Sequence, residues 1–560
     1  MPPRVEAVRF ENVRFTYAGR SEPALAGISF GVPPGRFVLV MGRTGSGKST
    51  LAKCLNRIVP CFQRGRLEGR ILLDGEPTEG KSVADLAGRV GVVLQDFEAQ
   101  LFATDVEQEI AFGLEQLGVP GPEIRARIDR VLALLGIEHL RKRDPNSLSG
   151  GEKQRLAIAA VLALEPRVLV FDEPTTDLDP EAKHQVFETL RELRARGLAA
   201  VVAEHEIDAT DFADRLVLLD GGRIVAEGPA AELRKDVPLL LRCGVRPRDL
   251  DRVVRALGIR ASGESVEEVE RAIRRELGGP ASAQAAASAE NTARAEPILE
   301  VRDVSFSYAD EPVLADVSLR FEAGAFTALI GPNGSGKSTL AKILTGLLRP
   351  SHGRVLWKGE NVTARSAREL ATRIGYVFQD PDHQLFCATV REEVAFGPKN
   401  LGVPEPELSR RVSEALRALR LEGLEEEDPF VLTKGQRQRL AIAAVLAQRP
   451  EFLVLDEPTT GLDYEEQQAV LELLSALNRQ GLSLLVITHS PWVVAEYARK
   501  AVVLLDGRVA FEGTLRDLFR RSTLVERARF RVPDVTRLSL RFGFAALGVP
   551  EFVSAFRVDP

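Results

Sequence analysis

Two copies of one glycine-rich pattern constrain this chain more than any other feature of its sequence. Residues 42–49 and 331–338 both match G-x-x-x-x-G-K-[ST]. In this pattern the glycines let backbone N–H groups face phosphate oxygens, the lysine reaches the terminal phosphates, and the serine hydroxyl holds Mg²⁺. We therefore predict two nucleotide sites, whose loop residues are Gly42, Gly45, Gly47, Lys48, Ser49 and Thr50 in one and Gly331, Gly334, Gly336, Lys337, Ser338 and Thr339 in the other.

The chain is an internal duplication. Three matched pairs share an offset of 284 (379 minus 95, 456 minus 172 and 489 minus 205), whereas the loop lysines differ by 289. Insertions of this size belong in surface loops. A chain of 560 residues exceeds one hydrophobic core, so we predict a first nucleotide-binding domain at 1–277, an alanine-rich linker at 278–297 and a second domain at 298–560.

Composition argues against two classes of function. The net charge is −6 and the pI is about 5.8, so we expect no nucleic-acid partner that is bound through bulk positive charge. No apolar run reaches the 18 residues that a membrane-spanning helix needs, so we expect no transmembrane segment of its own. The N-terminal sequence also lacks the apolar stretch of a secretory signal, which favours a cytosolic protein.

Acidic pairs follow an apolar strand-like run in each half. These pairs are Asp172-Glu173 and Asp456-Glu457. Apolar runs also lead into both glycine-rich loops, which predicts an α/β fold with loops and carboxylates at the carboxyl edge of a parallel sheet. In enzymes with such loops the first acid holds Mg²⁺ and the second polarises the attacking water.

Residues 148–152 read Leu-Ser-Gly-Gly-Glu and precede an apolar helical pattern. This motif, in order with the others and twice along the chain, resembles the ATP-binding cassette (ABC) family. The resemblance implies two tandem ABC nucleotide-binding domains, each with a helical subdomain and a small C-terminal helical appendage. It also implies that the two halves pair intramolecularly and that ATP is bound between the loop of one half and the motif of the other, the candidates being Ser149, Gly150 and Gly151, and Thr433 and Gly435.

The resemblance assigns further residues in pairs. Tyr17 and Tyr308 match the aromatic that stacks on adenine, although an aromatic in the core of a strand is the alternative. Gln95 and Gln379 match the glutamine that contacts Mg²⁺ and water. His205 and His489 match the histidine that contacts the γ-phosphate. The implied catalytic set is Glu173, Glu457, His205, His489, Gln95 and Gln379, and the implied metal set is Ser49, Gln95, Asp172, Ser338, Gln379 and Asp456.

The second copy of the helix-capping motif departs from the family pattern. It reads Thr433-Lys434-Gly435, with lysine in place of the first glycine. A side chain at this position can shift backbone amides that catalysis needs. We therefore expect both sites to hydrolyse ATP, but unequally.

The segments after Gln95 and Gln379 point to a narrower group. Both continue with Gln-Leu-Phe, then a short acidic stretch ending Ala-Phe-Gly, then Leu-Gly-Val-Pro. This resembles the ATPases of energy-coupling factor (ECF) transporters, which import vitamins and transition metals. The resemblance implies a membrane-embedded T component, a substrate-binding S component, and a location at the cytoplasmic face of the cell membrane. Leu101, Phe102, Leu385 and Phe386 suit contact with a partner helix, and ordinary packing of a helical subdomain is the alternative.

Two other functions remain possible on the sequence alone. A sugar-type ABC importer also uses fused cassettes, but commonly with one eroded nucleotide site, whereas both glycine-rich loops and both acidic pairs are intact in this sequence. A soluble translation or repair ATPase would predict a long charged linker or zinc-binding cysteines. The transported substrate is not encoded in this chain if an S component selects it.

Overall fold

The computed structural model describes residues 6–176, 178, 180–280, 296–309 and 311–556. The chain divides into two compact units, Met1–Arg248 with Asp463–Glu465, and Asp249–Leu462 with Glu466–Pro560. Most of the predicted linker, residues 281–295, lies outside the described residues. Each unit is described by itself below.

The first unit contains two sheets. A four-stranded antiparallel sheet has the order β2-β1-β4-β5, and a six-stranded sheet has the order β10-β9-β3-β8-β7-β6. In the larger sheet β3 pairs in parallel with both β8 and β9, and only β10 is antiparallel. The strands are β1 (Val8–Tyr17), β2 (Leu25–Val32), β3 (Phe37–Gly42), β4 (Gly65–Leu73), β5 (Glu76–Pro77), β6 (Val90–Val93), β7 (Val168–Asp172), β8 (Ala199–Ala203), β9 (Arg215–Asp220) and β10 (Arg223–Pro229).

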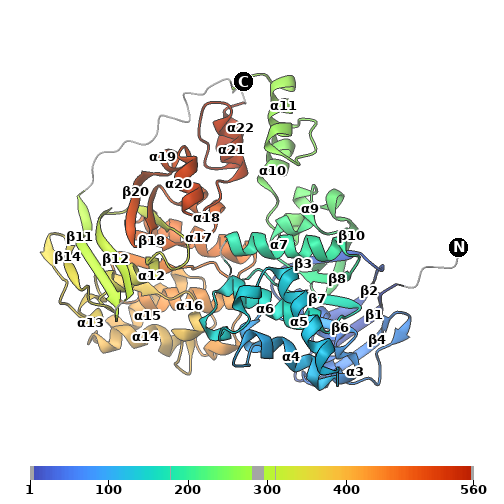
Figure 1. Ribbon diagram of the computed structural model, residues 1–560. Coiled ribbons are helices and arrows are strands. Elements are labelled where there is room, and N and C mark those ends of the chain that lie inside the picture. The colour runs from blue at the N-terminus through green and yellow to red at the C-terminus, as the bar shows by residue number, and fades with distance from the viewer. Residues whose placement is uncertain (1–5, 177, 179, 281–295, 310, 557–560) are drawn as a thin grey trace. The chain divides into compact units, whose positions relative to one another are not determined.

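Helices cover the larger sheet of the first unit. The strands β3, β7 and β8 are buried along their whole length, as expected for parallel strands with both faces covered. In Figure 1, α4, α5 and α6 lie together as one helical group, and their apolar faces share a core with the sheet. The helices are α1 (Lys48–Leu55), α2 (Ile58–Cys61), α3 (Val83–Ala87), α4 (Val106–Gln116), α5 (Gly121–Leu135), α6 (Gly150–Ala163), α7 (Pro180–Ala195), α8 (Ala230–Leu233) and α9 (Val237–Arg242).

The second unit repeats this architecture. Its sheets have the orders β12-β11-β14-β15 and β16-β17-β18-β13-β19-β20. The strands are β11 (Pro297–Tyr308), β12 (Glu311–Glu322), β13 (Phe326–Ile330), β14 (His352–Trp357), β15 (Glu360–Asn361), β16 (Ile374–Val377), β17 (Phe452–Asp456), β18 (Ser483–Ile487), β19 (Lys500–Leu505) and β20 (Arg508–Thr514). The helices that repeat those of the first unit are α12 (Lys337–Leu344), α13 (Ala367–Leu370), α14 (Val390–Asn400), α15 (Glu407–Ala418), α16 (Lys434–Leu446), α17 (Tyr464–Arg479) and α18 (Pro491–Tyr497). The predicted α/β class is confirmed in both units.

Helices from both halves of the sequence share one core in the second unit. The helices α10 (Asp249–Leu257) and α11 (Val266–Glu276) pack against α21 (Asp534–Leu540) and α22 (Val549–Ser554), as Figure 1 shows. The core includes Val253, Ile273, Leu538 and Phe552. Residues 249–276, which the sequence places at the end of the first domain, are therefore spatially part of the second unit. The remaining C-terminal helices are α19 (Leu515–Phe519) and α20 (Ser522–Arg527).

Candidate functional site

The glycine-rich loop of each unit joins a buried central strand to a helix. In the first unit it connects β3 to α1, and the buried Lys48 lies at the first residue of α1. The Lys48 Nζ donates to the carbonyl oxygens of Gly42 (2.9 Å) and Arg43 (3.0 Å). Burial lowers the pKa of Lys48, and Glu173 opposes that shift. In the second unit Lys337 Nζ makes the same two bonds, to Gly331 and Pro332, at 2.9 Å each.

Close backbone packing explains the first glycine of each loop. Gly42 has a φ of 153°, and a Cβ there would lie 2.1 Å from the carbonyl oxygen of Leu219 on β9. Gly331 has a φ of 159°, and its Cβ would lie 2.2 Å from the carbonyl oxygen of Leu504. Each loop is therefore pressed against a neighbouring strand, and this contact fixes the position of its backbone amides.

The loops fit a triphosphate. The hydroxyls of Ser46 and Ser335 are buried, and among the described residues neither has a hydrogen-bond partner. A buried hydroxyl without a partner costs free energy unless a ligand or water satisfies it. The N-termini of α1 and α12 begin at the loop lysines, and helix N-termini favour anions.

The predicted carboxylates lie at the carboxyl ends of β7 and β17. Asp172 is 2% exposed, and its Oδ1 accepts a hydrogen bond from Ser49 Oγ at 2.9 Å. Burial raises the pKa of Asp172, and the bond from Ser49 opposes the rise. The serine hydroxyl and the carboxylate are both hard oxygen ligands of the kind that Mg²⁺ prefers, so this donor set fits the metal that the loop pattern implies.

Both second acids have a backbone conformation that side chains rarely adopt. The φ angle is 50° at Glu173 and 46° at Glu457. Left-handed φ values at residues other than glycine store strain and concentrate at functional sites. The same conformation therefore occurs at the equivalent position of both units.

The histidines contact these glutamates. His205 follows β8, and its Nε2 lies 2.5 Å from Glu173 Oε1. Lys48 Nζ lies 3.9 Å from the same oxygen. In the second unit the distance from His489 Nε2 to Glu457 Oε1 is 3.7 Å. The first unit thus brings its loop lysine and its histidine to one oxygen of its second acid, and the second unit repeats the contact between histidine and second acid.

The predicted glutamines and tyrosines differ in exposure and in their contacts. The side chains of Gln95 and Gln379 are exposed beyond the ends of β6 and β16, and among the described residues neither is hydrogen-bonded to the carboxylates. Tyr17 is half-buried, with its hydroxyl 3.0 Å from Thr50 Oγ1. Tyr308 is 46% exposed, which leaves its ring available to a ligand.

The helix-capping motifs of both units have the same backbone. Ser149 caps α6 with φ −66° and ψ 158°, and Thr433 caps α16 with φ −63° and ψ 159°. Each belongs to a capping box, completed by Glu152 or Gln436. A Cβ at Gly150 would meet only Leu178, at 3.6 Å, so the lysine at 434 is accommodated without backbone change.

Two exposed phenylalanine pairs form a second candidate site. Phe102 stacks edge-on against Phe112, and Phe386 against Phe396, with ring centroids 4.7 Å apart in both pairs. Phe102 is 63% exposed and Phe386 is 61% exposed, whereas Leu385 is buried in the core. Packing in the core therefore explains why Leu385 is apolar, but it does not explain why the exposed positions 102 and 386 are phenylalanines.

Buried glutamates that the sequence analysis missed hold these phenylalanines in place. Glu109 Oε2 accepts the backbone N–H groups of Phe102 and Ala103 at 2.9 and 2.8 Å. Glu393 Oε2 does the same for Phe386 and Cys387, at 2.8 Å each. The sequence contains a sign of this role, because the two glutamates occupy equivalent positions in the duplicated segment.

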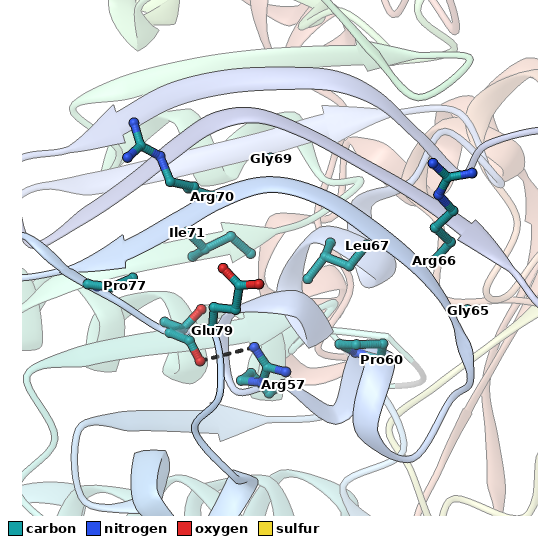
Figure 2. Close-up of a pocket in the computed structure, with 11 residues that line it drawn as sticks. Arg57, Pro60, Gly65, Arg66, Leu67, Gly69, Arg70, Ile71, Pro77 and Glu79 are labelled. Carbon is teal, nitrogen blue, oxygen red and sulfur yellow. Dashed lines mark hydrogen bonds between the residues drawn. The ribbon is translucent and has the colours of Figure 1, made fainter.

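A cavity of about 340 Å³ lies beside β4 in the first unit. Figure 2 shows Leu67 and Arg57 among its lining residues, and the Arg57 guanidinium donates to the carbonyl oxygen of Thr78 at 3.0 Å. The side chains of Arg66 and Arg70 project from the opposite side of β4. The lining contains none of the predicted nucleotide or metal residues, so this cavity is separate from the candidate site.

Within the described residues, no helix has both the length and the apolar character needed to cross a membrane.

Comparison with known proteins finds one matching region in each half of the chain. A family model described as ABC transporter matches residues 25–176 and 314–460. A protein of Caldanaerobacter subterraneus subsp. tengcongensis, named as an ABC transporter ATP-binding protein, is 41% identical over 541 residues and covers 95% of each chain. A protein of Methanosarcina mazei with the same type of name is 38% identical over 560 residues, 97% of this chain and 95% of the relative. Among solved structures, cbiO1 of Clostridium perfringens, described as part of the ABC transporter complex cbiONQ, is 34% identical and has a TM-score of 0.39, with 44% of this chain and 99% of that chain covered.

Proposed function

Because the chain belongs to the ABC transporter family of ATP-binding proteins, we propose that it is the energy-coupling ATPase of an ECF-type importer. The chain is an ABC ATPase with two tandem domains. Beyond this ATPase identity, we propose which type of transporter the chain belongs to and which membrane proteins it binds. This proposal rests on the duplicated segments after Gln95 and Gln379 and on the exposed phenylalanine pairs that these segments carry.

The phenylalanine pairs support docking of a membrane partner. Each pair offers apolar surface at the same position of its unit, Phe102 with Phe112 and Phe386 with Phe396. Burying one phenylalanine fully contributes about 1.5–3 kcal/mol. The backbone N–H groups of Phe102 and Phe386 donate to Glu109 and Glu393, which fixes the backbone of this surface, so little ordering is needed when a helix docks.

The residues of the candidate site divide the work of ATP hydrolysis. Lys48 and Lys337 contact the terminal phosphates, while Ser49 with Asp172, and Ser338 with Asp456, would hold Mg²⁺. When bound, the ion would neutralise charge on the phosphate oxygens. Glu173 and Glu457 accept a proton from the attacking water. His205 and His489 lie next to these glutamates and contact the γ-phosphate.

The proposed cycle couples closure to transport. Two ATP molecules draw the two halves of the chain together, each held by the loop of one half and the capping motif of the other. The phenylalanine surfaces then move the T component, which tips the S component and releases a vitamin or transition metal inward. Hydrolysis reopens the halves. In this proposal the T component holds the chain at the cytoplasmic face of the membrane.

Co-purification from native membranes tests the proposal. The tagged full chain is recovered in mild detergent and its partners are identified by mass spectrometry. We expect an integral-membrane protein with several spans together with a second, substrate-binding membrane protein. The double variant Phe102→Asp and Phe386→Asp is expected to lose both while still binding ATP.

A matched control keeps this test specific. Val225 on β10 is 47% exposed, and Val225→Asp is expected to retain the membrane partners. Recovery with ribosomes in place of membrane proteins would contradict the proposal and favour a soluble factor. Recovery with a membrane pair that imports sugars would instead favour the sugar-type importer.

A further inference from the structure

We infer that Tyr376 is a positioning residue that orients Asp456 for Mg²⁺, and that it makes the metal affinity of the second unit higher than that of the first. The inference rests on the proposed role of Asp456 as a metal-binding carboxylate. The two sites would then differ in metal affinity even though their motifs are the same.

The Tyr376 hydroxyl donates a hydrogen bond directly to Asp456. The distance from Tyr376 Oη to Asp456 Oδ2 is 3.0 Å. Tyr376 lies on the edge strand β16, which pairs in parallel with β17, where Asp456 is the last residue. Its ring stacks edge-on against Phe378, with centroids 4.9 Å apart, and this contact limits the positions that the hydroxyl can take.

The carboxylate in this bond is buried. Asp456 is 6% exposed, so its hydrogen bond with Tyr376 is shielded from competition with water.

The first unit has no donor at the equivalent position. With the offset of 284, Val92 on β6 corresponds to Tyr376, and Leu94 corresponds to Phe378. Val92 and Leu94 line a cavity of about 200 Å³. A hydrocarbon side chain cannot orient Asp172, whose Oδ1 instead accepts a hydrogen bond from Ser49.

The two bonds differ in what happens when a metal ion binds. Ser49 and Asp172 both belong to the proposed metal set, so a bound ion would compete with the hydrogen bond that joins them. Tyr376 lies outside the metal set, so its bond to Oδ2 would remain and would limit the directions in which Oδ1 can point. Hydrogen-bonded partners of metal ligands orient those ligands, and their loss typically costs about 10–100-fold in metal affinity.

Binding of Mn²⁺ tests the inference. Electron paramagnetic resonance measures free Mn²⁺ in titrations of the full chain with a non-hydrolysable ATP analogue. The variant Ser49→Ala isolates the second-unit site, and Ser338→Ala isolates the first-unit site. We expect Tyr376→Phe to weaken Mn²⁺ binding about 10-fold in the Ser49→Ala background and to change it less than twofold in the Ser338→Ala background.

Two further variants separate positioning from stability. Tyr497→Phe removes another tyrosine hydroxyl of the second unit and is expected to leave Mn²⁺ affinity unchanged in both backgrounds. Val92→Tyr places a tyrosine at the equivalent position of the first unit, where Val92 lines a cavity of about 200 Å³, and is expected to strengthen Mn²⁺ binding in the Ser338→Ala background. This gain tests the inference even if Tyr376→Phe unfolds.

The outcomes are distinguishable. Unchanged Mn²⁺ affinity in folded Tyr376→Phe, or equal losses in both backgrounds, would overturn the inference while leaving the proposed function intact. Folded Val92→Tyr that binds Mn²⁺ no more tightly in the Ser338→Ala background would also overturn it. An unsubstituted chain that binds neither Mn²⁺ nor the ATP analogue would overturn the proposed function itself.

Discussion

Nε2 of His205 lies 2.5 Å from Oε1 of Glu173, whereas the equivalent atoms of His489 and Glu457 are 3.7 Å apart. The residue types and their spacing along the chain are the same in both units. The contact distance nevertheless differs, and Lys48 also approaches the Glu173 oxygen, at 3.9 Å. The proposed general base, Glu173 in one unit and Glu457 in the other, therefore has different neighbours in two sites with the same motifs.

This difference leads to unequal effects of removing the two glutamates. An oxygen already held by His205 is less available to accept a proton from water, so we expect Glu457 to support more turnover than Glu173. Losing a general base costs about 10²–10⁴-fold at the affected site. Glu457→Gln is expected to lower steady-state phosphate release at least ~10-fold and Glu173→Gln less than ~3-fold.

Nucleotide binding provides the control for this comparison. Both variants are expected to bind a fluorescent ATP analogue with the affinity of the unsubstituted chain, because glutamine keeps the shape of glutamate. Equal losses of phosphate release in the two variants would contradict the inequality.

The loop glycines predict a contrast in stability. Gly42→Ala forces a Cβ to within 2.1 Å of the backbone of Leu219, whereas a Cβ at Gly45 meets nothing within 4 Å. Gly45 has a φ of 77°, so Gly45→Ala costs about 1 kcal/mol of backbone strain. We expect Gly42→Ala to cost at least ~2 kcal/mol more. Calorimetry measures the unfolding temperature of both variants and of the equivalent pair in the second unit, Gly331→Ala and Gly334→Ala. If the two variants of a unit lowered the unfolding temperature equally, the steric explanation would be wrong.

The duplicated motifs made much of the site predictable. The loops and acidic pairs each follow an apolar run, and the structure puts Lys48, Asp172 and Glu173 at one edge of a parallel sheet. The fold class and the ATPase family are confirmed. Both follow from local sequence, because loop shape and strand burial are dictated by residues that are close along the chain.

Other features depend on contacts that a pattern does not specify. Tyr376 and Asp456 are 80 positions apart and meet only because β16 and β17 are neighbours. The amphipathic pattern of α10 predicts a buried face, but it does not identify α22 as the surface that covers it. Periodicity shows that a side chain is buried and leaves the identity of its neighbours open.

The two glycines of the first capping motif predict opposite tolerance to substitution. A Cβ at Gly150 meets Leu178 at 3.6 Å, which is ordinary contact, whereas a Cβ at Gly151 would lie 2.9 Å from Cβ of Ala182. Gly150→Lys, which copies the second unit, is expected to change the free energy of unfolding by less than ~0.5 kcal/mol. Gly151→Ala is expected to cost about 1–3 kcal/mol. Calorimetric unfolding of both variants checks this, and a large loss for Gly150→Lys would show that Lys434 is not structurally neutral.

The buried Glu204 makes the stability of the first unit depend on pH. It is 1% exposed, and its two carboxylate oxygens accept hydrogen bonds from Thr175 Oγ1 and from the N–H of His205, both at 2.7 Å. Burial raises the pKa of Glu204, and the neighbouring Glu206 adds to the rise. The second unit has threonine, Thr488, at the equivalent position.

The sign of the effect follows from the raised pKa. Between the unfolded and folded pKa values the folded protein holds more protons at Glu204 than the unfolded chain does, so stability falls as pH rises. The fall begins near pH 4.5, the ordinary range for glutamate, and ends at the folded pKa. Glu204→Gln keeps the acceptor for His205 and cannot ionise. The variant is therefore expected to gain unfolding temperature relative to the unsubstituted chain as pH rises from 5 to 8.

The neighbouring Glu206 provides a control of opposite sign. The Lys183 ammonium lowers the pKa of Glu206, so its ionised form stabilises the fold above the unfolded pKa and that contribution is lost as pH falls. Because this pair is partly exposed, its effect is small. Because Glu206 also raises the pKa of Glu204, this control is made in the Glu204→Gln background, where Glu206→Gln is expected to lower the unfolding temperature slightly at pH 8 and not at the acid end of the range. A pH-independent shift for Glu204→Gln would show that the Glu204 carboxylate is not penalised by burial.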